Sequence, residues 1–195
     1  EPGDGVAVEN PGYRAAGHAF ALAGGRLHGV PVDGEGMDCQ VLSTLNDCRV
    51  AYVTPSHQYP LGVVMSLARR LELLAWAERS NGWIIEDDYD SEFHYEGKPT
   101  ACVQGLDPHG RTIYIGTFTK SLFPGLRIGY MLVPAALKAA ASQAIRGASW
   151  MVSPLLVELA CRWMEGGEAD RILVQQRQQL AQRASLLRHH LGRFN

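Results

Sequence analysis

The sequence predicts an α/β fold: a mostly parallel sheet with one antiparallel strand and helices on both faces. Short apolar runs alternate with helical segments, which is typical of parallel strands joined by right-handed crossovers. Most of these runs are continuously apolar, as expected for strands covered on both faces. The link from Thr119 to Ile128 is shorter than the dozen or so residues of a parallel crossover. The last strand should therefore run antiparallel to the strand before it.

The first two thirds of the chain contain most of the predicted sheet. A short helix is predicted over Arg14–Leu22, because Gly24-Gly25 is a typical helix C-terminal signal. A longer helix is predicted over 61–80, with one apolar face made of Val64, Leu67, Leu71, Leu74 and Ala75. The predicted strands are the apolar runs 6–8, 26–32, 50–54, 82–87, 112–118 and 128–133.

The last third of the chain is predicted to be helical. Pro134 occupies a first-turn position before an alanine-rich helix that reaches about Gly147, and another helix covers 153–164. From Asp170 a Gln- and Arg-rich helix runs to the end of the chain. Either it packs on the body as a surface helix, or it connects to a C-terminal part that is not in this sequence. Its apolar stripe comprises Leu173, Leu180, Ala184, Leu187 and Leu191.

Composition excludes several classes of protein. The chain has 195 residues, 46% of them hydrophobic and 19% charged, which is ordinary for a globular protein and unlike a coiled coil or a disordered chain. The net charge of −2 offers no basic face for nucleic acid. Nothing approaches the ~18 apolar residues of a membrane span, and no signal-peptide pattern opens the chain. The four cysteines form no CxxC pair, so we expect reduced thiols and a cytoplasmic protein.

Four predicted strands end in polar segments, and ligands of open α/β sheets bind at the carboxyl ends of strands. Each segment alone is explained by a turn. The acidic cluster in the third segment, however, needs a nearby cation, either Mg²⁺ or the protonated nitrogen of a cofactor. No GxxxxGK[ST] loop accompanies it, so no metal site is predicted. The segments are ENPGY at 9–13, TPSHQYP at 54–60, EDDYD at 86–90 and TFTKS at 117–121.

Lys120 decides between these interpretations. An amine at the mouth of a buried sheet can be desolvated and nucleophilic, and the hydroxyls of Thr117, Thr119 and Ser121 with Arg127 would cradle a phosphate. The alternative is a structural lysine at a strand end. A carbonyl cofactor with a phosphate and a basic ring nitrogen would use all of these groups, which points to pyridoxal 5′-phosphate (PLP).

Three motifs stand in order along this part of the chain: Asp87 with Tyr89, TFTK at 117–120, and GLRIGY at 125–130. Together they resemble the fold-type I PLP enzymes, the aspartate aminotransferase superfamily. More narrowly, ENPGY at 9–13, TPSHQYPLG at 54–62 and EDDYDSEF at 86–93 resemble the aminotransferase-like domain of MocR/GabR-type bacterial transcription regulators. Those regulators join a GntR-type winged helix-turn-helix to this domain. The resemblance extends from about residue 6 to 190.

The resemblance implies a role for each matching residue. Lys120 would form the internal aldimine with the cofactor, Asp87 would pair with the pyridine nitrogen, and Tyr89 would donate to the phenolic oxygen. Thr117 and Arg127 would bind the phosphate. Contacts with the ligand or a neighbouring subunit are expected at Tyr13, His57 and Tyr59, although Tyr13 is equally explained by packing and His57 by its loop. The other acidic residues of the cluster, Asp88, Asp90 and Glu92, are interpreted as turn and surface residues.

The sequence departs from the family pattern in three respects. Many aminotransferases have an asparagine where this chain has Tyr59, which weakens the case for efficient transamination. The family's phosphate-binding glycine turn and its small domain, with the substrate-carboxylate arginine, lie outside the sequence. The chain begins without Met close to its first strand and is expected to be the central part of a large domain. The expected organisation is a partial PLP-binding domain over 1–165 and a long helix over 166–195 leading toward an absent small domain.

Two functions follow from the resemblance. In the first, the domain forms an aldimine with an amine or amino acid and acts as the effector sensor of a transcription regulator, contacting DNA only through an N-terminal domain absent from this chain. In the second, the protein is a working PLP-dependent aminotransferase in which Lys120 moves a proton at the substrate Cα. A binding domain without cofactor remains only if Lys120 makes no imine. A homodimer with no membrane association is expected in either case.

Overall fold

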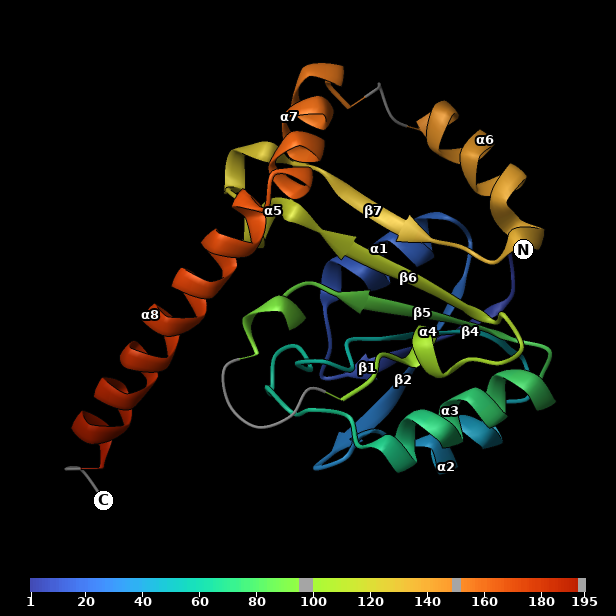
Figure 1. Cartoon of the computed structure of the whole chain (residues 1–195). Helices are drawn as coiled ribbons and strands as arrows, with labels where there is room; N and C mark the ends of the chain where they lie inside the picture. The colour runs from blue at the N-terminus through green and yellow to red at the C-terminus, as the bar shows by residue number, and fades with distance from the viewer. Residues whose placement is uncertain (95–99, 149–151, 193–195) are drawn as a thin grey trace. The chain divides into compact units, whose positions relative to one another are not determined.

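The computed structural model describes residues 1–94, 100–148 and 152–192 (Figure 1). These residues contain one seven-stranded sheet with the strand order β3-β2-β1-β4-β5-β6-β7. The predicted runs all appear in it as strands. Their bounds are β1 Gly5–Asn10, β2 Arg26–Asp33, β3 Gly36–Met37, β4 Cys48–Val53, β5 Trp83–Asp88, β6 Thr112–Thr117 and β7 Gly129–Leu132.

Most strand pairs are parallel, as the sequence predicts. Strand β1 pairs in parallel with β2 and β4, β4 with β5, and β5 with β6. Strand β7 lies beside β6 and its arrow points the opposite way, which confirms the predicted antiparallel strand (Figure 1). A second antiparallel strand was not predicted: β3 pairs with β2 through Val32 and Met37. Two residues are too few to produce a hydrophobic run.

Three predicted helices are confirmed: the helix at 14–22, the helix at 153–164 and the long C-terminal helix. Each starts within two residues of the predicted position. The predicted helix after Pro134 is a 3₁₀ turn, η3 Ala135–Leu137, followed by α6. Four short elements, α2, α4, α5 and η1, give no periodic signal and were not predicted. The helices are α1 Arg14–Leu22, α2 Cys39–Thr44, α3 Leu67–Arg79, α4 Val103–Leu106, α5 Phe118–Ser121, α6 Lys138–Ala148, α7 Pro154–Glu165 and α8 Glu168–Leu191; the remaining 3₁₀ turns are η1 Ser91–Phe93 and η2 Pro124–Leu126.

Helix α3 corrects one prediction. It begins at Leu67 rather than 61, because Ser66 accepts a hydrogen bond from Arg69 N and caps it. Of the predicted apolar face, Leu74 is buried and Ala75 is half-buried, but Val64 precedes the helix, and Leu67 and Leu71 are exposed. The buried positions also include a charged residue, which a hydrophobic pattern does not reveal. They are Arg70, Leu73, Leu74, Trp76 and Ala77.

The chain divides into two compact units. The first comprises Glu1–Tyr89, Thr100–Gly116 and Tyr130–Gln143, and the second comprises Asp90–Pro99, Thr117–Gly129 and Ala144–Asn195. The predicted boundary at 165 stays a prediction, and the end of its segment 166–195 (193–195) lies outside the described residues. Among the described helices, none is long and apolar enough to cross a membrane.

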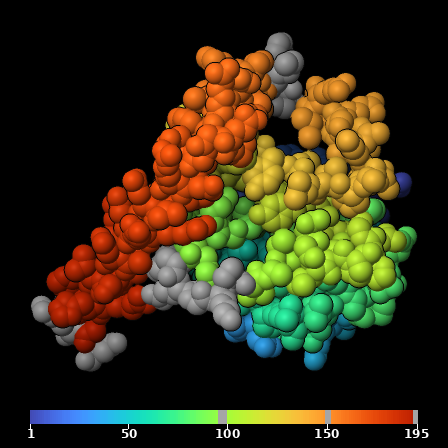
Figure 2. All heavy atoms as spheres, viewed as in Figure 1, coloured from blue at the N-terminus to red at the C-terminus, as the bar shows by residue number. Residues whose placement is uncertain are grey.

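The main core of the first unit lies between the sheet and helices α2, α3 and α4. Figure 2 shows α3 and the segment around α4 side by side on this face. Helix α1 contributes no residue to this core. Its Phe20 packs against Tyr52 of β4, with ring centres 5.8 Å apart. The core members are Ala7, Val30, Met37, Cys39, Leu42, Cys48, Ala51, Val53, Met65, Leu73, Leu74, Trp76, Ala77, Ile84 and Val103.

The second unit has a smaller core around Leu126, Ile128 and Ala160. Phe123 packs edge-on against Trp163 of α7, with ring centres 5.9 Å apart. Along the predicted stripe of α8, Leu173, Leu180 and Ala184 are half-buried, whereas Leu187 and Leu191 are exposed. The stripe is therefore covered at its N-terminal end only, within the described residues.

Candidate functional site

The carboxyl ends of β1, β4 and β5 meet at one edge of the sheet in the first unit, because these strands are parallel neighbours. This edge carries Glu9, Thr54 and Asp87, together with the loops that follow β1 and β4. Three of the four polar segments predicted as ligand-binding therefore converge here. The fourth, beginning at Thr117, follows Gly116, which pairs with Asp88 of β5.

Asp87 is half-buried at this edge and accepts a hydrogen bond from the Tyr52 hydroxyl through Oδ2. Burial raises the pKa of the Asp87 carboxyl, the Tyr52 hydrogen bond opposes the rise, and the neighbouring Asp88 charge adds to it. Among the described residues, no cation pairs with Asp87 and no donor reaches its Oδ1. Tyr52 was not predicted as a site residue, because it stands inside an apolar strand that carries no polar signal.

The rest of the acidic cluster has partners within the protein. Glu86 accepts hydrogen bonds from Val103 N at 2.9 Å and Gln104 N at 2.8 Å. Asp88 accepts a hydrogen bond of 2.8 Å from the Tyr114 hydroxyl and is buried. The interpretation of Asp88 as a turn or surface residue is therefore wrong, because strand β5 continues through it. Asp87 is the carboxylate of this strand that is left open to a ligand.

A second carboxylate, Glu9, anchors the loop after β4. Its Oε2 accepts from Thr54 Oγ1 at 2.7 Å, Thr54 N at 3.3 Å and Gln58 Nε2 at 3.2 Å. Burial raises the pKa of Glu9, and the Asp87 charge adds to the rise. Its Oε1 is buried without a hydrogen-bond partner in the described part of the chain. No role was predicted for Glu9, because a single glutamate at a strand end is usually part of a turn.

Tyr13 and Tyr59 are brought together by this network. Gln58 Nε2 donates to the carbonyls of Pro11 at 2.8 Å and Tyr59 at 2.7 Å, which ties the loop after β1 to the loop after β4. The two tyrosine rings meet edge-on with centres 5.6 Å apart, and both are about half exposed. They line a surface pocket of about 550 Å³ formed by residues 10–15 with Tyr59 and Pro60.

Tyr89 donates its hydroxyl proton to the main-chain carbonyl of His57 at 2.8 Å. This bond joins the end of β5 to the loop after β4. A cofactor oxygen that takes the Tyr89 proton has to compete with that carbonyl. The predicted role of Tyr89 stays a prediction, as does a ligand contact of the His57 side chain.

In the second unit, Thr117, Lys120 and Arg127 belong to one closed turn. Phe118 N donates to Ile128 O at 3.0 Å, and Thr117 Oγ1 accepts from Thr119 N at 3.1 Å. Arg127 has a φ of 52°, an uncommon conformation for a residue other than glycine. Backbone strain of this kind is concentrated at functional sites.

Lys120 and Arg127 are both exposed and form no ion pair with any described residue. The desolvation of Lys120 expected from its strand-end position is therefore not found, because α5 is a short helix at the surface of its unit. Two unpaired cations and the hydroxyls of Thr117 and Thr119 on one turn fit an anionic group such as a phosphate. An open carboxylate without a cation, at Asp87, fits a protonated ring nitrogen. Each unit by itself thus carries types of group that PLP requires.

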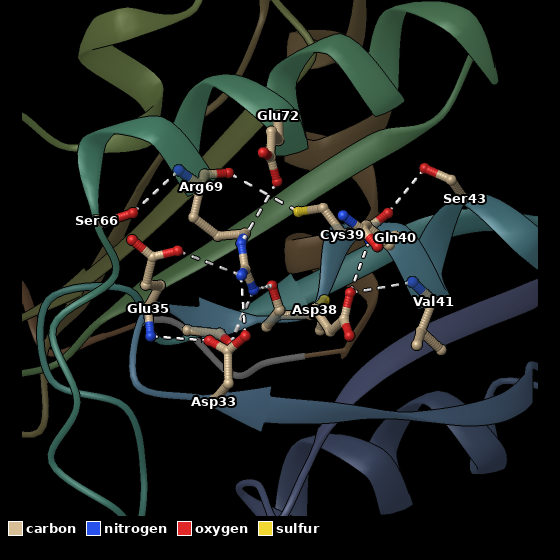
Figure 3. Close-up of polar contacts among 12 residues, drawn as sticks. Asp33, Glu35, Asp38, Cys39, Gln40, Val41, Ser43, Ser66, Arg69 and Glu72 are labelled. Carbon is tan, nitrogen blue, oxygen red and sulfur yellow. Dashed lines mark hydrogen bonds and ion pairs between the residues drawn. The ribbon is translucent and has the colours of Figure 1, made fainter.

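Arg69 is the centre of another charged cluster in the first unit, which Figure 3 shows between β2, β3, α2 and α3. It donates to Met37 O at 2.6 Å and to Asp33 Oδ2 at 2.9 Å, and lies 3.4 Å from Glu72 Oε2. The Arg69 hydrogen bond lowers the pKa of Asp33. These contacts hold the β2–β3 hairpin against α3. Each charged residue of this cluster has a partner within it, so the cluster needs no ligand to explain it.

His28, Asp47 and Cys48 place three potential metal-ligand atoms within 4.8 Å of one another. Asp47 Oδ2 is shared between His28 Nε2 at 3.1 Å and Arg26 Nη2 at 2.9 Å. Burial raises the pKa of the Cys48 thiol to about 11, which disfavours the thiolate that a metal needs. The cluster is therefore explained by the ion pair between Arg26 and Asp47, with a neutral Cys48 thiol beside it.

Comparison with known proteins agrees with the site chemistry. The chain belongs to the family described as aminotransferase class I and II, whose model matches residues 1–194.

The chain is similar to proteins of two kinds. It is 38% identical to the probable rhizopine catabolism regulatory protein MocR of Rhizobium meliloti, over 98% of this chain and 40% of that protein. It is 47% identical to the HTH-type transcriptional regulator YdeL of Bacillus subtilis, over 70% of this chain and 29% of that protein. The kynurenine aminotransferase of Pyrococcus horikoshii, solved with PMP, superposes with a TM-score of 0.87 at 33% identity, covering 91% of this chain and 46% of that one. The chain thus spans less than half the length of each of these proteins.

Proposed function

We propose that this chain is the PLP-binding, effector-sensing domain of a bacterial transcription regulator. The observation that carries the proposal is Asp87: a half-buried carboxylate at the carboxyl edge of a parallel sheet, held by Tyr52 and facing no cation of the described chain. A carboxylate in that state is suited to a cationic ring nitrogen. The regulator reading is supported by similarity to MocR along almost the whole chain.

Each predicted site residue has a role in this proposal. Lys120 holds the cofactor aldehyde, and Asp87 keeps the ring nitrogen protonated. Thr117 and Arg127 bind the phosphate. When bound, the cofactor supplies a carbonyl that condenses with amines and a ring that withdraws electrons. Tyr89 orients the cofactor through its hydroxyl.

The ligand is proposed to be an amine or amino acid that enters beside the aromatic pair. Tyr13 and Tyr59 line the pocket after β1, and His57 lies on the loop that Gln58 and Thr54 anchor. Tyr59 stands where many aminotransferases have asparagine, and its ring closes on Tyr13 rather than offering an amide. Loss of that amide favours a sensor over an efficient transferase.

A working aminotransferase is the second candidate, favoured by the likeness to the kynurenine aminotransferase at a TM-score of 0.87. In that case Lys120, once free, moves a proton at the substrate Cα. DNA contact through an N-terminal domain, a homodimer and a cytoplasmic location belong to the regulator proposal. They rest on the similarity to regulators.

The experiment that tests the proposal measures DNA binding by the full-length, PLP-loaded protein with and without a panel of amines and amino acids. A sensor changes its DNA affinity with one ligand, and Lys120→Ala abolishes the response while leaving ligand-free DNA binding intact. Transamination of the same ligand, followed by keto-acid release, is the control readout. Turnover without any effect on DNA affinity would replace the sensor with the enzyme.

A further inference from the structure

We propose that Tyr52 is a positioning residue that holds the Asp87 carboxylate in one orientation and in its ionised form for the ring nitrogen of the cofactor. The proposal rests on the assignment of Asp87 in the proposed function and adds a residue to that site. Tyr52 does not touch the ring nitrogen; it acts through Asp87.

The Tyr52 ring is held in place by contacts other than its hydrogen bond to Asp87. Tyr52 lies on β4 opposite Ile85 of β5, two residues before Asp87. Its side chain is 4% exposed, and its ring packs edge-on against Phe20 of α1, with ring centres 5.8 Å apart. The hydroxyl donates to Asp87 Oδ2. A donor on a rigid, buried ring leaves Oδ1 of the same carboxylate as the oxygen that faces a ligand.

The charges around Asp87 make this donor consequential. Two other acidic groups interact electrostatically with Asp87 or with Tyr52: Asp88 on the same strand and Glu9 on β1. No cation among the described residues interacts with Asp87 or Tyr52. Burial and Asp88 raise the pKa of Asp87, and the Tyr52 hydrogen bond is what lowers it. Without that hydroxyl, the remaining influences from the described residues, burial and Asp88, favour a neutral Asp87, which cannot hold a pyridinium.

The chain contains a matched control on the next strand. Tyr114 of β6 donates to Asp88 at 2.8 Å and stacks on Tyr130, with ring centres 6.1 Å apart. The pair therefore repeats the Tyr52–Asp87 chemistry: a ring held by an aromatic neighbour and a hydroxyl on a β5 carboxylate. Tyr114→Phe removes the same atom as Tyr52→Phe but leaves the hydrogen bond to Asp87 in place. Any effect that it has through a less ionised Asp88 would favour an ionised Asp87, opposite to the effect expected of Tyr52→Phe.

The test uses the full-length protein loaded with PLP that carries ¹⁵N in its ring. Tyr52→Phe should raise the Kd for PLP by about tenfold or more, the scale of a hydrogen bond to a charged group. It should also move the ring ¹⁵N shift from the pyridinium toward the neutral-pyridine value. Tyr114→Phe should change the Kd less than about twofold and leave the shift unmoved. The ¹⁵N shift separates this role from packing, because a packing defect does not change the protonation of the ring.

A double-mutant cycle with Asp87→Asn identifies the route of the effect. If Tyr52 acts through Asp87, Tyr52→Phe has no further effect on the Kd or the shift in the Asp87→Asn background. Equal losses in both backgrounds, or an unchanged Kd and shift in Tyr52→Phe alone, overturn the proposal for Tyr52. An Asp87→Asn variant that binds PLP with unchanged Kd and shift instead overturns the assignment of Asp87 in the proposed function.

Should Tyr52→Phe fail to fold, Tyr52→3-fluorotyrosine keeps the ring and the hydroxyl and makes the hydroxyl a stronger donor. Because the ring nitrogen is already protonated in the wild-type protein, its ¹⁵N shift should stay at the pyridinium value while the Kd falls. An unchanged or higher Kd contradicts the role of Tyr52.

Discussion

Arg70 and Glu86 form an ion pair inside the first unit, with Arg70 Nη1 3.8 Å from Glu86 Oε1 and side chains only 1% and 0% exposed. The guanidinium also donates to Pro55 O at 2.8 Å and Met65 O at 3.1 Å, the two ends of the loop that carries His57 and Tyr59. One buried cation of α3 thus fixes both ends of the loop after β4 and pairs with the carboxylate next to Asp87.

Replacing Arg70 tests this link. Arg70→Met should lower the free energy of unfolding by about 3–5 kcal/mol, because it leaves the Glu86 charge buried without its partner. Urea denaturation of the full-length protein measures the loss. Arg79→Met, the same change at an exposed position of α3, is the control and should stay within about 0.5 kcal/mol of the wild type. A similar small change in both variants would contradict the role given to Arg70.

Glu9 predicts a pH dependence of stability. Burial raises the pKa of Glu9 in the folded state above its value in the unfolded chain. The stability that the protonated Glu9 contributes is therefore fully present below the unfolded-state pKa. It is lost as the pH rises through the folded-state pKa. Glu9→Gln keeps an acceptor for Thr54 and cannot ionise. Relative to the wild type, the variant should therefore gain stability as the pH rises from acid toward neutral. Equilibrium unfolding at a series of pH values checks this, and a constant difference between the two proteins would refute it.

Gly12 predicts a steric effect at the pocket. A Cβ at this position would lie 2.2 Å from the Glu9 carbonyl oxygen, a backbone atom that cannot move aside. Gly12→Ala should displace the turn that carries Tyr13 and cost roughly 1–3 kcal/mol of stability, as overpacking usually does. Gly34→Ala is the control, since nothing lies within 4 Å of its Cβ position. Thermal unfolding compares the two, and equal melting temperatures would show that the turn is not constrained as described.

The sheet was predictable because its strands are continuous apolar runs and because the link after β6 is too short for a crossover. Helix α1 was predictable because glycines mark its end. What failed depended on particular polar contacts. Helix α3 starts where Ser66 caps it, and its buried face includes Arg70 because that residue meets Glu86, sixteen positions along the chain. Hydrophobic periodicity contains no information on such a pair.

The candidate site shows the same division. Motif resemblance selected Asp87, Thr117, Lys120 and Arg127, and among the described residues Asp87, Lys120 and Arg127 form no ion pair. The residues that support them were missed: Tyr52 belongs to an apolar strand, and Glu9 and Gln58 meet only after β1 and β4 have paired. From sequence alone, residues that contact a ligand are easier to predict than residues that position other side chains.

Borohydride reduction of the PLP-loaded full-length protein, followed by peptide mass mapping, tests the central claim most directly. The account predicts that the cofactor mass is fixed on the peptide that contains Lys120 and that Lys120→Ala, with its fold confirmed by circular dichroism, retains none. Attachment at another lysine, or no attachment to the folded wild-type protein, would contradict it.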